Sequence, residues 1–143
     1  FYTYGAGQKH NSLINQLFKS YISGNEMSLS PCQHYRDYIH VLDAAEGIAK
    51  LSSIDYSGII NLGSGRVIKL KDFVKLFWDE CNANPSLLQF GRHELSSLEQ
   101  SQPKSFANIS KLIKLTNWSP ALSIEHGVKK TIQQMHDLNE YKL

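Results

Sequence analysis

The stretch that decides the fold is HYRDYIHVLDAAEGI, residues 34–48. An arginine and an aspartate, Arg36 and Asp37, stand directly before a short run in which aliphatic residues alternate with tyrosine and histidine. The run passes at once, through Asp43, into a segment rich in alanine. The alternating run therefore passes into the alanine-rich segment without a linker. Arg36 and Asp37 stand at the start of the alternating run.

The alternating run predicts a strand over residues 37–41, because successive side chains of a strand point to opposite faces and place Tyr38 and His40 on the same side. The alanine-rich segment predicts a helix over residues 42–51. Asp43 falls in its first turn, where the exposed backbone amides and the helix dipole favour a carboxylate. A strand that runs directly into a helix is therefore expected at the centre of the chain.

The rest of the chain alternates in the same way. Helix-spaced apolar residues between caps and stops predict helices over residues 11–22, 72–81, 108–116 and 123–138. Either Asn11 or Ser12 is the first cap, and either Asn108 or Ser110 starts the third of these helices. Short apolar runs predict strands over residues 27–30, 58–62 and 87–90. The predicted fold class is α/β, a small mixed domain of short strands and helices that occupies residues 1–143.

Length and composition exclude several classes of protein. The chain has 143 residues, 41% hydrophobic and 20% charged, as in one globular domain, and no apolar run approaches the roughly 18 residues of a membrane span. The net charge of +2 comes from charges of both signs spread along the chain, which argues against nucleic acid or a membrane as partner. Two cysteines without paired spacing indicate neither a disulfide framework nor a zinc site, so a reducing cytoplasm is the expected location.

Residue patterns alone carry little chemistry. The glycine pairs in residues 5–7 and 63–65 predict turns, because neither continues into the third glycine of a dinucleotide fingerprint. The six histidines include no i, i+4 pair, and no serine, histidine and acid set can be assembled from spacing. No metal site is therefore predicted. Residues 91–105 are polar and aperiodic, which is typical of a long functional loop.

A resemblance to a known family begins at the opening stretch. RDYIHVLDAAEGI resembles a segment of the extended short-chain dehydrogenase/reductases, the nucleotide-sugar epimerases, 4,6-dehydratases and 4-reductases. Four more segments resemble that family in the same order: YGAGQ (4–8), GIINLGSGRVIKLKDFV (58–74), ANISKLIKLTNWSP (107–120) and SIEHGVKKTI (123–132). The sequence is thus similar to the C-terminal, substrate-binding part of the family. Residues 30–37 and 87–91 look most similar to CDP- or dTDP-deoxysugar synthases of the abequose synthase type.

The resemblance assigns a role to Arg36. In the family the matching arginine binds the substrate's diphosphate, which suits a guanidinium because it is always charged and donates two parallel hydrogen bonds. Without the resemblance, an ordinary surface ion pair would be the simpler interpretation. Asp37 is expected to organise a turn or to pair with a neighbouring base.

Further site residues carry over from the same resemblance, at the start of the first helix, in the strand after it and in the opening stretch. The resemblance implies nucleoside- and phosphate-binding roles for Asn11, Ser12, Leu13, Ser28 and Tyr38. A pure capping role for Asn11 or Ser12, and a core position for Tyr38, stay open as alternatives. Tyr2 belongs to the loop between the cofactor and sugar sites and is the expected cofactor contact. Arg92 is the candidate for a second phosphate ligand.

Several residues depart from the family's pattern. Tyr2 stands where the family usually has an asparagine that contacts the substrate, and Ala6 replaces the common proline. Arg92 lies too early in the chain for the family's late Arg-x-x-Glu element. Asn108 replaces the usual aspartate, which affects helix capping little because asparagine caps about equally well.

The largest departure is what the chain lacks. The family's glycine-rich cofactor fingerprint, its catalytic Tyr-x-x-x-Lys pair and its active-site Ser or Thr lie upstream of the YGAGQ segment, and nothing resembling them is present. In the family the tyrosine acts as general acid and base while hydride passes to or from the nicotinamide. No catalytic residue is therefore predicted here, and NAD or NADP is expected to bind to a missing N-terminal Rossmann half.

The chain begins at Phe1 without a methionine, so a fragment of a longer polypeptide is expected, although a trimmed terminus would explain this too. The predicted function is the substrate-binding portion of an NAD(P)-dependent enzyme that epimerises, dehydrates or reduces an NDP-hexose for surface polysaccharide biosynthesis. The chain alone is not expected to be active. Its expected partners are an NDP-sugar and the missing Rossmann half, with a homodimer left open. The alternative is a non-catalytic, stand-alone binding or assembly module derived from the same fold.

Overall fold

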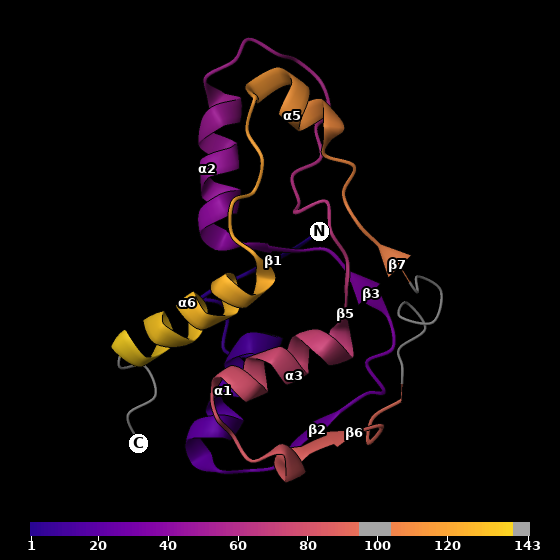
Figure 1. The fold of residues 1–143 in the computed structure, drawn as a ribbon, viewed down its shortest axis with the longest axis vertical. Coiled ribbons are helices and arrows are strands. Elements are labelled where there is room, and N and C mark those ends of the chain that lie inside the picture. Colours follow the sequence, from indigo (N-terminus) through magenta and orange to yellow (C-terminus); the bar gives the residue numbers. More distant parts are fainter. Residues whose placement is uncertain (95–103, 139–143) are drawn as a thin grey trace.

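The computed structural model describes residues 1–94 and 104–138 of the chain, so most of the predicted loop at residues 91–105 lies outside the described residues. Helices and short strands alternate along it (Figure 1). In chain order the elements are β1 (Tyr2–Tyr4), α1 (Leu13–Ser23), β2 (Met27–Leu29), β3 (Tyr35–Arg36), β4 (Tyr38–His40), α2 (Val41–Ser52), β5 (Ile68–Lys69), α3 (Leu70–Glu80), the 3₁₀ turn η1 (Pro85–Leu87), β6 (Leu88–Phe90), β7 (Lys104–Ser105), α5 (Ser110–Thr116) and α6 (Ile124–Asp137).

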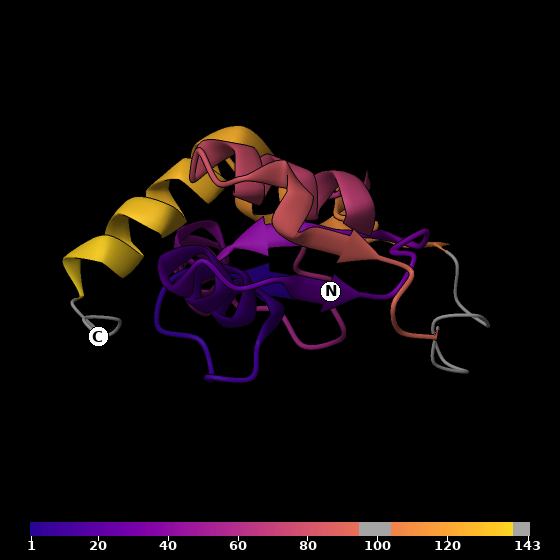
Figure 2. The ribbon, with the colours of Figure 1, turned by 90° about the horizontal axis from the view of Figure 1, so that it is seen from below.

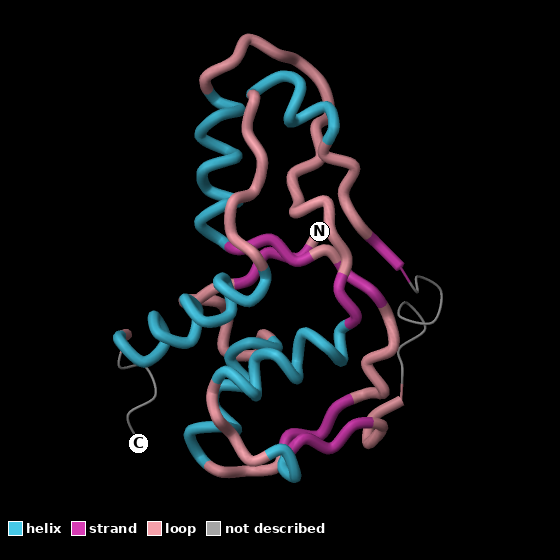
Figure 3. The backbone as a smooth tube through the Cα atoms, viewed as in Figure 1, coloured by secondary structure: helices cyan, strands magenta, loops and turns pink. Residues whose placement is uncertain are grey.

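The strands form three separate small sheets (Figure 3). Strand β1 pairs in parallel with β4, and β2 pairs in parallel with β6. In the third sheet β3 lies between β5, which is antiparallel to it, and β7, which is parallel. The mixed α/β architecture predicted from the sequence is confirmed.

The opening stretch folds as its two periodicities predict. Strand β4 ends at His40, and helix α2 begins at the next residue. The join is made by the His40 ring, whose Nδ1 accepts a hydrogen bond from the Leu42 N–H at 3.3 Å. Because this ring satisfies one of the free amides of the first helical turn, the strand needs no loop before the helix.

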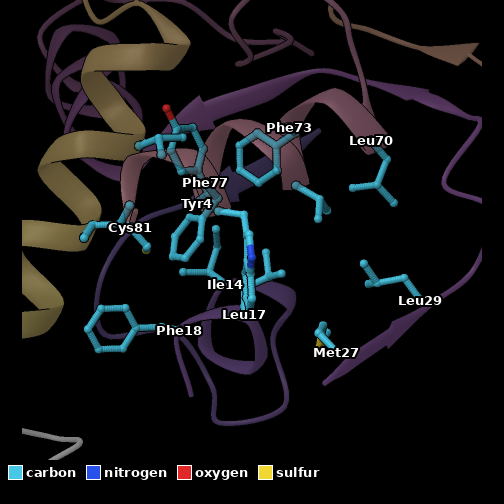
Figure 4. Close-up of a cluster of buried hydrophobic side chains, with 14 of the residues drawn as sticks. Tyr4, Ile14, Leu17, Phe18, Met27, Leu29, Leu70, Phe73, Phe77 and Cys81 are labelled. Carbon is cyan, nitrogen blue, oxygen red and sulfur yellow. The ribbon is translucent and has the colours of Figure 1, made fainter. Parts of the chain in front are cut away.

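The larger hydrophobic cluster lies among α1, α3 and α6. Figure 2 shows α3 and α6 together on one side of the molecule, with the indigo N-terminal part of the chain on the other. In the close-up of Figure 4, Ile14 and Leu17 of α1 point toward Phe73 and Phe77 of α3. Phe73, Phe77 and Trp78 are fully buried. Each such side chain contributes roughly 1.5–3 kcal/mol through apolar burial, so α3 is the central helix of the core.

A second cluster joins α2 to α5 through Ile39, Ala44, Leu112 and Trp118. Ile39 of β4 packs into this cluster, whereas Tyr38, its neighbour on the opposite face, packs against the larger one. The alternation read from the sequence therefore divides β4 between two cores.

The prediction of a buried strand at residues 58–62 was wrong. The structure forms no strand there, and Ile59 is 86% exposed. Ile60 and Leu62 pack instead against the α2–α5 cluster. A short apolar run does not by itself distinguish a strand from an extended loop that packs on helices, because a strand also needs a partner for its backbone.

Element boundaries differ in two further places. Helix α3 starts at Leu70, two residues before Asp72, because β5 runs straight into it as β4 runs into α2. Strands β1, β3, β5 and β7 were not predicted. Two residues each, in β3, β5 and β7, are too few to show an alternating pattern, and β1 contains Tyr2, which was expected in a loop. Among the described residues, no helix combines the length and the apolar character needed to cross a membrane.

Gly127 allows α6 to cross β1 and β4 closely. A Cβ added there would collide with the Tyr4 hydroxyl oxygen and lie 3.3 Å from the His40 ring. We expect Gly127→Ala to destabilise the fold by about 1–2 kcal/mol, because overpacking outweighs the roughly 1 kcal/mol that alanine gains over glycine in a helix. Urea unfolding measures the change.

Tyr4→Phe provides the matched control for Gly127→Ala. Removing the hydroxyl removes the worst collision, so the double variant should regain part of the lost stability in a double-mutant cycle. A stabilised Gly127→Ala single variant would contradict the close crossing of α6 over Tyr4.

Candidate functional site

A cavity of about 340 Å³ opens between β1, the start of α1, β3 and β4. We call it the Arg36 cavity; its lining residues are Tyr2, Thr3, Tyr4, Gln8, Ser12, Leu13, Ile14, His34, Arg36, Tyr38, Leu70 and Phe73. Five of the residues predicted to bind ligand therefore share one wall: Tyr2, Ser12, Leu13, Arg36 and Tyr38. They come from three separate parts of the chain.

Arg36 is held from several directions. It lies at the centre of the three-stranded sheet, opposite Ile68 on one side and Ser105 on the other. Its side chain is 3% exposed, and Nη1 donates a hydrogen bond to the Tyr35 carbonyl at 2.8 Å. The Tyr2 ring lies with its centroid 5.8 Å from the guanidinium carbon. The sheet and this contact fix the direction in which the guanidinium points.

Tyr38 is both a core residue and a wall of the Arg36 cavity. Its ring stacks on Phe73 at 4.2 Å between centroids and with 8° between planes. Tyr2 lies 5.7 Å away on β1, tilted by 48°. The two interpretations left open for Tyr38 are thus compatible, because one face of the ring serves the core while the residue still lines the cavity.

The start of α1 forms another edge of the Arg36 cavity. Ser12 is the cap, because its hydroxyl accepts a hydrogen bond from the Asn15 N–H at 3.3 Å. The buried Asn15 amide donates to the carbonyls of Gln8 and Lys9, at 2.6 and 2.9 Å. The loop before the helix is therefore anchored, and Asn11, the other candidate cap, is exposed.

Three predicted residues lie outside the described lining of the Arg36 cavity. Asn11 directly precedes the lining residue Ser12, and its carbonyl accepts a hydrogen bond from the Gln16 side-chain amide at 2.7 Å. Ser28 lies on β2 opposite Gln89, and Arg92 follows β6 with its Nη2 3.5 Å from the Gln89 Oε1. Figure 1 shows β2 and β6 on the far side of α3 from β1. Ligand contacts at these three positions stay predictions.

Asp37, the carboxylate that follows Arg36, connects distant parts of the chain through its hydrogen bonds. Its fully buried Oδ1 accepts hydrogen bonds from the Ser64 N–H at 2.7 Å and the Ser64 hydroxyl at 2.6 Å. Oδ2 accepts from the Gly65 and Ala107 N–H groups, at 2.9 and 3.0 Å. We call this the Asp37 junction. Of the two roles expected for Asp37, it organises the turn, and it also ties the 63–65 turn and Ala107 to β4.

Gly63 and Asp43 also connect segments that are far apart in the sequence. A Cβ on Gly63 would lie 2.5 Å from the Ala107 Cβ and 2.9 Å from the Asp37 Oδ2, so the junction requires glycine there. Asp43, besides lying in the first turn of α2, accepts hydrogen bonds from the Ala121 and Leu122 N–H groups at 3.3 and 3.0 Å. The sequence carried no signal for these partners, because they lie far away along the chain.

His40 has an electrostatic environment that disfavours its charged form. Burial lowers the pKa of His40, the nearby Asp43 carboxylate opposes this, and Lys130 adds to the lowering. Its Nδ1 accepts from Leu42, so the proton of the neutral ring is assigned to Nε2. Burial also raises the pKa of the neighbouring Tyr4 hydroxyl well above its usual range.

We expect the stability of the fold to fall as the pH drops below about 6.5, the ordinary pKa of histidine. Protonation of His40 costs more in the fold than in the unfolded chain, so the loss grows until the pH passes the lowered folded pKa. Urea midpoints between pH 8 and pH 5 measure it. His40→Asn keeps a capping acceptor and should flatten the profile, whereas exposed His10→Asn should not. An unchanged slope in His40→Asn would contradict this assignment.

A larger hollow, of about 550 Å³, lies next to the 63–65 turn and α5. Arg66 is the one charged side chain among its described lining residues, and none of the predicted ligand-binding residues reaches it. The larger hollow is therefore not the better candidate. The Arg36 cavity is preferred because a buried cation, a capped helix start and three tyrosines converge on it.

The two glycine turns at residues 5–7 and 63–65 take part in close packing. Gly5 approaches Val41 so closely that a Cβ would lie 2.5 Å from its Cγ1, and Gly63 serves the Asp37 junction. Both glycine turns are thus used for packing rather than for holding phosphate. Tyr2, the predicted cofactor contact, lies beside Arg36 and Tyr38. In residues 1–94 and 104–138, no three His, Cys, Asp or Glu side chains are placed to hold a metal ion.

Two enzymes of nucleotide sugars are similar in sequence to this chain. No family model matches the sequence. The chain is 33% identical over 100 residues to the UDP-glucuronate 4-epimerase of Thermodesulfobacterium geofontis, over 68% of this chain and 29% of that protein. It is 25% identical over 134 residues to the CDP-abequose synthase of Salmonella muenchen, over 92% of this chain and 44% of that protein. The chain belongs to the extended short-chain dehydrogenase/reductase family.

Solved structures of this family share the fold. The UDP-glucose 4-epimerase of Thermotoga maritima superposes with a TM-score of 0.84 at 19% identity, over 97% of this chain and 45% of that one. The dTDP-glucose 4,6-dehydratase of Bacillus anthracis, solved in complex with NAD, gives 0.83 at 18%, over 96% and 43%. The chain aligns with the C-terminal part of such enzymes and spans less than half the length of these relatives.

Proposed function

We propose that this chain supplies the substrate-binding portion of an NAD(P)-dependent NDP-sugar epimerase, dehydratase or reductase in surface polysaccharide biosynthesis. The observation that carries the proposal is the convergence of Arg36, Ser12, Leu13 and Tyr38 on one cavity. A buried guanidinium of fixed orientation suits a diphosphate, which it binds through paired, charge-assisted hydrogen bonds. The start of α1 adds the positive end of a helix dipole at the cavity edge.

In this proposal the chain binds and orients the substrate but does not carry out the reaction. NAD or NADP, held by the Rossmann half that the relatives' greater length implies, would exchange hydride with the sugar. The general acid and base would come from that half as well, since the chain has no Tyr-x-x-x-Lys pair. This chain's residues fix where the diphosphate lies and therefore which sugar carbon faces the cofactor.

The outer face of α2 is the proposed contact with the Rossmann half. Asp43, Ala44 and Gly47 are buried, whereas Val41, Leu42 and Ile48 are 38%, 44% and 59% exposed. The exposed positions of α2 thus include three large aliphatic side chains beside the charged Glu46 and Lys50. A face of this kind is expected where another part of the enzyme packs.

A non-catalytic binding module is the second candidate. It is favoured by the closed core, since Phe73, Phe77 and Trp78 are fully buried without any further domain. Codons upstream of Phe1 that encode a glycine-rich βαβ unit and Tyr-x-x-x-Lys would support the enzyme, and a start codon directly before Phe1 would support the module. Both candidates place the protein in the cytoplasm, in keeping with Cys81, which is a free buried thiol.

Calorimetric titration tests the proposed function. The chain is titrated with UDP-glucose and CDP-glucose, and separately with UDP and CDP. We expect saturable binding that is stronger for one base than for the other, because the cavity joins a phosphate-binding cation to an aromatic wall. A folded chain that binds none of the four ligands would overturn the proposal for the isolated chain.

A further inference from the structure

Tyr2 is a half-exposed ring on the wall of the Arg36 cavity. It is 48% exposed, whereas Arg36 beside it is 3% exposed. Its backbone is fixed, because Tyr2 pairs with Tyr38 across β1 and β4 and its N–H donates to the Asp37 carbonyl at 2.9 Å. The strand therefore holds the ring at the Arg36 cavity, with much of its surface open to solvent.

The contacts of Tyr2 are with aromatic and cationic groups. Its ring centroid lies 5.8 Å from the Arg36 guanidinium carbon and 5.7 Å from the Tyr38 ring. Tyr38 is in turn stacked on the buried Phe73. The ring thus adjoins the cation expected to bind phosphate and is backed by a rigid aromatic row, so it can offer a flat apolar surface with little loss of entropy on binding.

We propose that Tyr2 determines specificity in the Arg36 cavity: its ring packs against the ring-shaped group that adjoins the phosphate of the ligand. The inference rests on the proposed function. The ring-shaped group is a pyranose or a nucleobase, both of which present a flat face to an aromatic side chain. Phosphates without such a group gain nothing from Tyr2, although they still meet the Arg36 guanidinium.

Two variants separate the aromatic surface from the hydroxyl and from mere bulk. Tyr2→Phe keeps the ring, and Tyr2→Leu keeps an apolar side chain without a π face. Because Tyr2 is half exposed and outside the larger cluster, both variants should fold; circular dichroism and urea unfolding check this. Each variant is titrated with UDP-glucose, UDP and inorganic pyrophosphate.

We expect Tyr2→Leu to weaken UDP-glucose binding about five- to tenfold, which corresponds to the loss of an aromatic contact, and Tyr2→Phe to weaken it less than about threefold. Pyrophosphate binding should change by less than about twofold in both. If Tyr2→Leu weakens UDP binding as much as UDP-glucose binding, the group that packs on Tyr2 is the nucleobase. If only UDP-glucose binding is weakened, the group is the sugar.

Two results overturn the inference while the proposed function stands: unchanged UDP-glucose affinity in Tyr2→Leu, or an equal loss for pyrophosphate, which would make Tyr2 a support of Arg36 only. Absence of binding by the unaltered chain would overturn the proposed function and this inference together.

Discussion

Replacing Asp37 with alanine is expected to destabilise the fold by about 3–5 kcal/mol. The carboxylate is fully buried and accepts four hydrogen bonds, two from Ser64 and one each from Gly65 and Ala107. Hydrogen bonds to a charged group contribute roughly 1.5–3 kcal/mol each, and buried donors left without an acceptor add a penalty. Urea unfolding of the purified variant measures the loss.

Asp37→Asn sharpens the test. The amide keeps one acceptor oxygen but turns a donor toward N–H groups, so about half of the full loss is expected. Exposed Asp55→Ala is the control for loss of one negative charge and should change stability by less than about 0.5 kcal/mol. If Asp37→Ala were as mild as Asp55→Ala, the Asp37 junction would not be holding the 63–65 turn.

Replacing Arg36 with alanine is expected to weaken nucleotide-diphosphate binding by at least about 30-fold, in line with the 2–5 kcal/mol or more that truncating one partner of a buried charge pair costs. Arg36 is the charged side chain that faces the cavity shared by Ser12, Leu13 and Tyr38. Arg36→Lys keeps the charge but not the planar fork, so an intermediate loss is expected. Calorimetric titration with UDP-glucose and CDP-glucose measures both variants.

Arg66→Ala is the matched control for Arg36→Ala. Arg66 is an exposed arginine outside the described lining of the Arg36 cavity, so its removal changes the net charge equally without touching the proposed site. Equal losses from both variants would indicate long-range charge rather than a phosphate contact. Unchanged affinity in a folded Arg36→Ala variant would remove Arg36 from the site.

The parts of the fold that could be predicted depend on interactions between residues that are close in the sequence. Helix α1 ends at Ser23 and is capped by Gly24, whose left-handed φ of 65° suits glycine, and α6 begins after the Ser123 cap. The change from alternation to helical spacing at residues 37–43 marks the β4–α2 join. In each case neighbours a few residues apart make the hydrogen bonds, so the sequence displays both partners.

The candidate site could be predicted in part. The family segments pointed to Arg36, Tyr38, Ser12 and Leu13, and the structure brings these four to one cavity. Asn11 and Ser28 were assigned from the same resemblance, and Arg92 was a candidate although it departs from the family's pattern, yet the described cavity wall does not include these three. Matching a segment identifies which residues are available for a site, but a side chain's direction depends on the packing around it.

By itself, the sequence determined the existence of the helices, the Ser123 cap and the central strand-to-helix join, because these depend on periodicity and on contacts between near neighbours. The family resemblance also came from the sequence alone, through its matched segments. Only the tertiary structure decided that residues 58–62 pack as a loop, that Asp37 binds a turn 27 residues away, and that the Tyr2 ring lies against Arg36. The reason is physical: a hydrogen bond or ring contact across the fold forms wherever packing brings its partners together, and residue spacing along the chain leaves no trace of it.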